Sequence, residues 1–296
     1  TVWQELSRRY ADRIYAFEHP TLTVSPIENA IALATQLPAR ADLHLVSHSR
    51  GGLIGELLCR CGVAAGQEPF AGEDLDVFKS AAGSAEGDLK EAREHQCKEL
   101  NRLNTLLKQK QFAITRFVRV ACPARGTTLA SERLDTWLSI LRHLVGLISG
   151  SEASPVYQFL SDLVLLVARQ RAKPEVLPGL EAMMPASPLV KVLNRPNLEV
   201  SSDLSIIAGD IEDRSALGRL KLLLPDLFYG GDHDLVVDTS SMFGGARRSK
   251  DAARFFFDQG PDVCHFHYFR NPKTATRLLA GLAQAGTRRS VRARLA

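Results

Sequence analysis

The sequence predicts an α/β fold: a mostly parallel, doubly wound sheet covered by helices on both faces. Short β-rich runs alternate with segments of helical periodicity, which is typical of parallel sheets. A chain of 296 residues with 45% hydrophobic content can also bury a core of this size. The predicted strands are RIYAF (13–17), LHLVS (43–47), TRFVRVACP (115–123), LSIIAG (204–209) and a shorter DLVVD (234–238).

The composition argues against several functional classes. The chain has 37 basic and 33 acidic residues, and four of its arginines lie in the tail at 288–296. We expect this tail to be a solvated end. Five cysteines without a CxxC pair indicate neither a disulfide framework nor a zinc site. The longest apolar run, at 163–168, is far short of the roughly 20 residues of a membrane span. We therefore expect a cytoplasmic protein with no nucleic-acid partner, no transmembrane segment, no metal and no cofactor.

Helices are predicted between the strands. Ser25-Pro26 begins a helix at 25–37, since serine is a good N-cap and proline suits the first turn. Trp3, Leu6 and Tyr10 lie at helical spacing, which predicts that the first ten residues are the end of a helix leading into the strand at 13–17.

Two insertions interrupt the alternation of strands and helices. Residues 64–112 contain a polar loop and then a charged helix from about 85 to 110, on which Leu100, Leu103 and Leu107 form a narrow stripe. Residues 130–195 contain two amphipathic helices, which form either a cap over the sheet edge or a plain packing layer. Their apolar positions are Leu134, Trp137, Leu138, Leu141, Leu144 and Val145, and Val156, Phe159, Leu160, Leu163 and Leu166.

Residues 43–53, LHLVSHSRGGL, place a serine between an apolar strand and a helix. A nucleophile elbow holds its serine at positive φ, and the residues two positions away must be small. Ser47 and Gly51 meet this requirement, although serine stands where glycine is usual. The motif predicts that Ser49 is a nucleophile and that the backbone N–H of Arg50 is an oxyanion donor at the start of the helix. A phosphate-binding turn is the alternative, but neither GxGxxG nor GxxxxGK[ST] is present.

Five segments, the elbow among them, resemble the α/β-hydrolase superfamily, specifically its lipase- and esterase-like members. They occur in family order and span residues 43–270. The resemblance implies a single α/β-hydrolase domain over 1–296, with a helical insertion at 64–112 and a cap or lid at 130–195. The segments are HSRGG (48–52), similar to the His-Ser-x-Gly-Gly elbow; CPARGTTLAS (122–131), similar to the Pro-x-x-Gly-Thr/Ser turn before the lid; MMPASPLVKVLN (183–194), similar to the lid exit; DHDLVVDTSS (232–241), similar to the acid loop; and CHFHYF (264–269), similar to the histidine loop.

In this fold the chain order of the catalytic residues is serine, acid, histidine. The resemblance implies Asp234 as the acid, because it precedes Leu-Val-Val as the family acid precedes small-x-Val; Leu235 stands in place of the family glycine. Asp232 is its main rival, and Asp210 ends a strand. His265 is the candidate base, and His267 is the alternative because it has the same parity. Five other histidines are expected to be structural or exposed: His19, His44, His95, His143 and His233. The resemblance implies no catalytic role for His48, because a histidine precedes the serine in many relatives without catalysing.

One element of the family pattern is missing. The second oxyanion N–H usually comes from a His-Gly loop that follows an earlier strand. Either this chain is a piece of a longer protein or its domain lacks half of the oxyanion hole. Because a sheet cut at an interior strand would expose unpaired backbone, we expect an N-terminal extension of about 20–50 residues to supply the strand and the loop.

Three functions are consistent with the predicted fold and site residues. The first is a serine ester hydrolase that acts on a small-molecule or lipid ester, in which the hydrophobic segment 130–195 forms an acyl pocket. The second is a catalytically degenerate recognition or scaffold module of a larger protein. The third is a peptidase or acyltransferase on the same residues, because a fold does not determine its chemistry.

Overall fold

The computed structural model describes residues 2–11, 13–21, 23–127, 177–210, 234, 236–249, 252–260, 263, 265 and 267–283. Within these residues four parallel strands form one sheet in the order β1-β2-β3-β4. The strands are β1 (Asp42–His48), β2 (Ala113–Val120), β3 (Asp203–Asp210) and β4 (Ala253–Gln259). The all-parallel sheet confirms the predicted α/β class.

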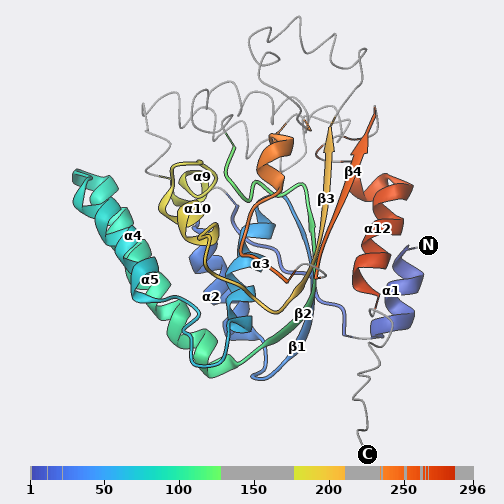
Figure 1. The fold of residues 1–296 in the computed structure, drawn as a ribbon, viewed down its shortest axis with the longest axis horizontal. Coiled ribbons are helices and arrows are strands. Elements are labelled where there is room, and N and C mark those ends of the chain that lie inside the picture. Colours follow the sequence, from blue (N-terminus) through green and yellow to red (C-terminus); the bar gives the residue numbers. More distant parts are fainter. Residues whose placement is uncertain are drawn as a thin grey trace, which may run out of the picture.

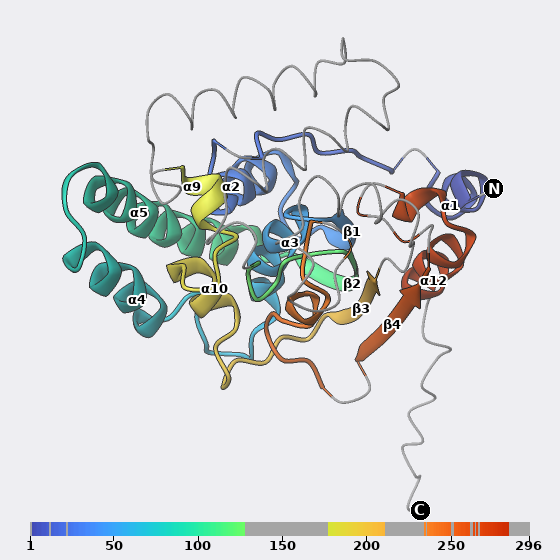
Figure 2. The ribbon, with the colours of Figure 1, turned by 90° about the horizontal axis from the view of Figure 1, so that it is seen from above.

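Helices flank the sheet on both sides (Figure 1). The helices α1 (Val2–Tyr10) and α12 (Pro272–Leu282) lie on one side. The other side carries α2 (Pro26–Gln36), α3 (Gly51–Cys59), α4 (Gly72–Gly83), α5 (Gly87–Lys110), α9 (Pro178–Glu181) and α10 (Pro188–Leu193). The view from above in Figure 2 shows α3 next to β1 and β2, and α4 and α5 further out. Short 3-10 turns lie at Arg60–Gly62, Thr239–Met242 and Tyr268–Arg270.

The predicted start of α2 is confirmed. Ser25 caps the helix by accepting from the N–H of Glu28, and the Glu28 side chain accepts from the N–H of Ser25. This reciprocal capping box satisfies two N–H groups that the first turn would otherwise leave without partners. The periodic residues Ile27, Ala30, Ile31 and Ala34 are buried, as their spacing predicts.

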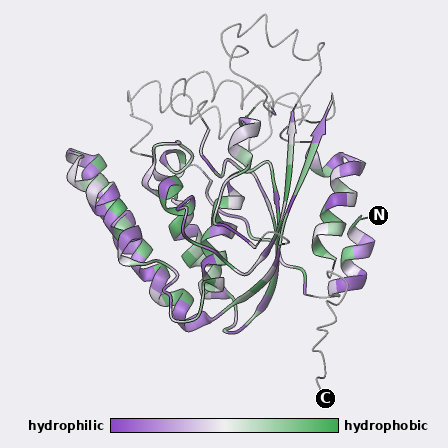
Figure 3. Cartoon of the chain, in the orientation of Figure 1, coloured by the Kyte–Doolittle hydropathy of each residue, from purple (hydrophilic) through white to green (hydrophobic). Residues whose placement is uncertain are grey.

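The charged segment at 72–110 is a pair of packed helices. The predicted stripe of Leu100, Leu103 and Leu107 is buried on α5, which packs against α2 and α4. Figure 3 shows hydrophilic and hydrophobic residues alternating around α4 and α5, as expected for helices with one buried face. Helix α4 was not predicted, because its sequence GEDLDVFKSAAG has two glycines and only a few buried residues to mark a period.

Two predicted strands are wrong. Residues 13–17 have no regular secondary structure, because no described strand pairs with them; the Tyr15 side chain is 82% exposed. Of the predicted strand 234–238, Val236 and Val237 lie in a bend, and the Asp234 carboxylate accepts the N–H groups that a sheet ladder would use.

Strand β4 was not predicted from the sequence; it ends at Gln259, six positions before His265. The amphipathic helices predicted at 134–145 and 156–166 lie outside the described residues. None of the helices in the described part of the chain is long and apolar enough to span a membrane.

Helix α3 lies very close to β2 because two of its residues are glycines. A Cβ atom on Gly52 would lie 2.3 Å from the Cys122 sulfur, and one on Gly55 would lie 2.3 Å from the Phe117 ring. A Cβ on Gly51 would instead lie 3.8 Å from the Cβ of Ser47, which is an ordinary contact. The two inner glycines therefore set how closely the helix that follows Ser49 packs on the sheet.

We expect Gly52→Ala to lower the free energy of unfolding by about 1–3 kcal/mol, because the added methyl group overpacks a rigid site. Gly51→Ala is the matched control and should change the stability by less than about 0.5 kcal/mol. Urea denaturation of both variants measures the difference. Equal stability of the two variants would contradict the close packing of α3 on β2.

Candidate active site

Ser49 occupies the predicted strained turn between β1 and α3. Its φ is +52°, in the left-handed region that residues other than glycine rarely adopt. Its backbone N–H donates to the carbonyl of Val120 at 2.9 Å, and its carbonyl accepts from Gly52 at 3.0 Å. The turn is therefore fixed to the end of β2 on one side and to the first turn of α3 on the other.

The structure brings Ser49, His265 and Asp234 together in one hydrogen-bonded row. The Nε2 atom of His265 lies 2.9 Å from Ser49 Oγ, and its Nδ1 atom lies 2.8 Å from Oδ2 of Asp234. Asp234 has no exposed surface and His265 is 2% exposed, whereas Ser49 is only partly buried. The row thus runs from a buried carboxylate to a partly accessible hydroxyl.

The Asp234 carboxylate is held by three N–H groups. Its Oδ1 accepts from Val236 at 3.1 Å and from Val237 at 2.8 Å, and its Oδ2 faces the His265 ring. A carboxylate can only accept hydrogen bonds, so Nδ1 of His265 carries the proton of that contact. In the neutral ring Nε2 is then the lone-pair nitrogen, oriented to accept the hydroxyl proton of Ser49.

Arg50 contributes to the turn through both its backbone and its side chain. The backbone N–H of Arg50 lies directly before α3, and within the described residues it donates no backbone hydrogen bond. Arg50 is 1% exposed, and its guanidinium donates to the carbonyls of Val24 and Pro20. Burial lowers the pKa of Arg50 to about 9. The side chain thus attaches the segment before α2 to the residue after Ser49.

A buried charged cluster joins α3 to the segment that follows Asp234. The Glu56 carboxylate on α3 pairs with Arg119 of β2 and, at 2.9 Å, with Arg248. Arg119 also donates to the carbonyls of Met242 and Gly244. Burial alone would raise the pKa of Glu56, but Arg248 and Arg119 together lower it. Because an unpaired buried charge is costly, the cluster holds residues 242–248 on the helix that follows Ser49.

The segment that carries His265 also packs closely on the sheet. A Cβ atom on Gly209, near the end of β3, would lie 2.2 Å from Val263 and 2.7 Å from the Tyr268 hydroxyl. Glycine at this position lets the segment around His265 approach the strand end. The His265 N–H donates to the carbonyl of Asp234 at 3.1 Å, so the two residues are joined by backbone as well as side chains.

The other sequence candidates lie elsewhere or outside the described residues. His267 directly precedes the 3-10 turn at Tyr268–Arg270, and within the described residues the histidine that contacts Ser49 is His265 instead. Asp210 ends β3 and accepts from the side chain of Gln259 at 3.1 Å. Asp232 lies outside the described residues. Glu56, Arg119 and Arg248 were not identified from sequence; the available signal was a glutamate within the apolar helix segment GGLIGELLC.

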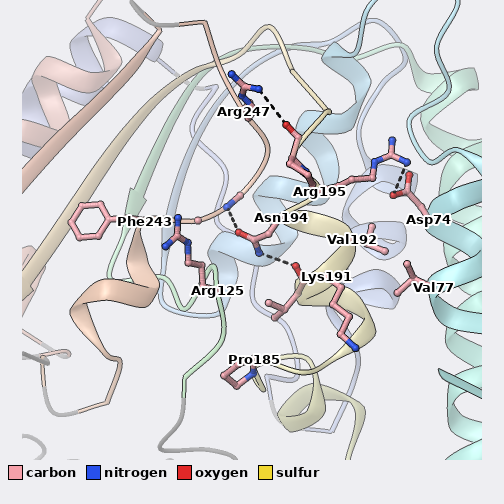
Figure 4. Close-up of a pocket in the computed structure, with 14 residues that line it drawn as sticks. Asp74, Val77, Arg125, Pro185, Lys191, Val192, Asn194, Arg195, Phe243 and Arg247 are labelled. Carbon is pink, nitrogen blue, oxygen red and sulfur yellow. Dashed lines mark hydrogen bonds and ion pairs between the residues drawn. The ribbon is translucent and has the colours of Figure 1, made fainter. Parts of the chain in front are cut away.

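A cavity of about 550 Å³ lies away from the row, next to α10 (Figure 4). Its lining includes Arg125, Lys191, Arg195 and Arg247 but none of the three residues of the row. Arg195 pairs with Asp74 at 3.4 Å, and Figure 4 shows the Lys191 and Arg247 side chains pointing in different directions. The described residues contain no group of histidine, cysteine and acidic side chains suited to a metal ion.

His48 lies against the row and makes stability depend on pH. Burial lowers the pKa of His48 to about 4, and the neighbouring His265 acts in the same direction, while Asp234 and the carbonyl of His265 act against it. The unfolded chain therefore binds a proton at His48 below about pH 6.5, whereas the folded chain does not until about pH 4. This group costs no stability above pH 6.5 and destabilises the fold progressively as the pH falls.

We expect wild-type protein to lose about 2–3 kcal/mol more unfolding free energy than His48→Gln between about pH 7 and pH 4.5. Chemical denaturation of both proteins at the two pH values measures the difference. Other titrating groups are common to both proteins and cancel in the comparison. Parallel pH profiles would contradict a neutral His48.

A protein-family model, the Domain of unknown function (DUF7379), matches residues 1–85 and 97–283 of the chain. The matched ranges include Ser49, Asp234 and His265. A search of curated proteins finds no match. The family description assigns no activity, so the chemistry has to be argued from the site itself.

Proposed function

We propose that this chain, which belongs to the DUF7379 family, is a serine hydrolase that cleaves carboxylic esters through an acyl-enzyme. The observation that supports the proposal is the row in which His265 lies 2.9 Å from Ser49 and 2.8 Å from the fully buried Asp234. A nucleophile, a base within hydrogen-bond distance and an acid that orients the base are the parts that nucleophilic catalysis needs. The positive φ of Ser49 adds the strained turn of a nucleophile elbow.

In the proposed acylation, Nε2 of His265 takes the hydroxyl proton of Ser49 while Oγ bonds to the ester carbonyl carbon. The carbonyl oxygen becomes an oxyanion, and the N–H of Arg50 donates to it at the N-terminus of α3. Asp234 stabilises the imidazolium form of His265. The bond from the carbonyl carbon to the alcohol oxygen then breaks, and His265 returns its proton to that oxygen.

Deacylation repeats the sequence with water as the nucleophile. His265 removes a proton from water, and the hydroxide oxygen bonds to the acyl carbon. Collapse of the second tetrahedral intermediate breaks the bond to Ser49 Oγ, which regains its proton from His265. The products are a carboxylic acid and free enzyme.

The proposal includes the finer fold that the resemblance implies, an α/β-hydrolase sheet with a cap at 130–195. Two described contacts support an insertion there. The N–H of Thr127 donates to the carbonyl of Met183 at 2.7 Å, and Asn194 donates to the carbonyl of Ala124 at 2.7 Å. The described residues that come before and after 128–176 are therefore adjacent, as the two ends of an inserted unit would be.

Labelling with a fluorophosphonate probe tests the function. We expect the folded protein to gain the mass of one phosphonyl group and peptide mapping to place it on Ser49, with no labelling of the heat-denatured chain. Short acyl esters and matched amides then separate an esterase from a peptidase. Absence of both labelling and ester turnover would contradict the proposal and favour the non-catalytic recognition module.

A further inference from the structure

The backbone of His265 is held on both sides of its Cα atom. Its N–H donates to the carbonyl of Asp234 at 3.1 Å, and its own carbonyl lies 2.7 Å from Nε2 of His48. The first contact belongs to the row already described. The second comes from a different part of the chain, the residue directly before Ser49.

The chemistry of the second contact fixes its direction. A carbonyl oxygen only accepts, so Nε2 of His48 carries the proton and donates it. The low pKa of His48 keeps its ring neutral near pH 7, and the lone pair is then on Nδ1. The contact is therefore a hydrogen bond from a neutral imidazole to the backbone of the proposed base.

The His48 ring is also packed in place. Its centroid lies 4.7 Å from that of His265, 5.6 Å from Phe269 in an edge-to-face arrangement and 6.4 Å from Tyr268. Three aromatic rings of the histidine segment thus surround one ring from the end of β1. Packing against these rings favours one orientation of His48, the one in which its donor faces the His265 carbonyl.

We infer that His48 is a positioning residue, which holds the backbone of His265 so that the His265 ring stays in line with Ser49. The inference rests on the proposed function of the row. His48 and Ser49 are adjacent in sequence, so a single strand end carries both the nucleophile and the donor that fixes its base. A displacement of about 1 Å in such a row can cost a large factor in rate.

Neutrality of His48 is part of this role. In acyl transfer His265 becomes an imidazolium, and a second positive ring at 4.7 Å would oppose that charge. A neutral donor holds the backbone without this repulsion. Glutamine can replace it, because its amide nitrogen reaches about as far as Nε2 and is also an uncharged donor.

The test compares His48→Leu, which removes the donor, with His48→Gln, which retains one. We expect His48→Leu to lower kcat and the rate of fluorophosphonate labelling about tenfold at unchanged KM, because the variant loses the one hydrogen bond from residue 48 to the His265 backbone. His48→Gln should stay within about threefold of wild type. Circular dichroism and melting temperatures show whether each variant is folded.

Proton NMR provides a readout that does not need turnover. The low-field signal of the His265 Nδ1 proton shared with Asp234 should broaden or disappear in His48→Leu and persist in His48→Gln. Two outcomes would overturn the inference and leave the proposed function standing. In the first, wild type is active and both variants keep its kcat and labelling rate. In the second, His48→Gln is folded but as slow as His48→Leu. If wild type shows neither labelling nor turnover, the proposed function fails, and the NMR signal alone supports or overturns the positioning role.

Discussion

Replacement of Ser49 by alanine is expected to lower ester turnover on the order of a thousandfold or more and to abolish fluorophosphonate labelling. The variant loses the atom that bonds to the acyl carbon, and only oxyanion stabilisation and substrate binding then contribute to the rate. Steady-state hydrolysis of short acyl esters, with the probe as a second readout, measures the effect. The fold should persist, because the change removes one partly accessible oxygen.

Ser47→Ala is the matched control, with the same chemical change two residues earlier on β1. Ser47 Oγ is buried, and within the described residues it has no hydrogen-bond partner. Alanine also keeps the small side chain that the turn requires. Loss of activity in Ser47→Ala, or wild-type turnover in Ser49→Ala, would show that the nucleophile has been misassigned.

The elbow was predictable because it depends on local sequence. A strand, a small residue on each side of the serine and a helix-forming segment all lie within 43–59, and the structure has them with φ at +52°. The same locality explains the correct prediction of α2, whose capping box needs only Ser25 and Glu28. Structural features that depend only on residues close together in the sequence can therefore be predicted from the sequence.

Pairing between distant segments limited the other predictions. Residues 13–17 have strand-forming composition, but a strand also needs a neighbour's backbone, and none of the described strands provides it. The sequence ARFFFDQ of β4 has three consecutive aromatic residues, so it lacks the alternation that would mark a strand with one buried face. Both outcomes depend on the sheet rather than on the segment.

The candidate site shows the same division. The family order of the motifs ranked Asp234 and His265 first, but the contacts of His265 with Ser49 and with Asp234 join residues that are 216 and 31 positions apart. The support beneath them was not predictable. Glu56 and Arg119 are 63 positions apart, and charged side chains are expected at the surface unless a partner is known.

The two histidines of CHFHYF give a sharp test of the row. His265→Ala should abolish probe labelling and lower turnover on the order of a thousandfold or more, because Ser49 loses the base 2.9 Å away. His267→Ala should reduce either rate only mildly, through packing of the segment at 267–270. The labelling rate of each folded variant, normalised to wild type, measures the ranking.

The pair is informative because both variants remove the same imidazole group from neighbouring positions of one segment. General disruption of the segment would slow both variants to a similar extent. Loss of the base slows one alone, and raising the pH should restore part of the His265→Ala rate, since hydroxide can replace a missing general base. A slow His267→Ala beside a normal His265→Ala would transfer the role of base to His267, and the 2.8 Å contact of His265 with Asp234 would then be purely structural.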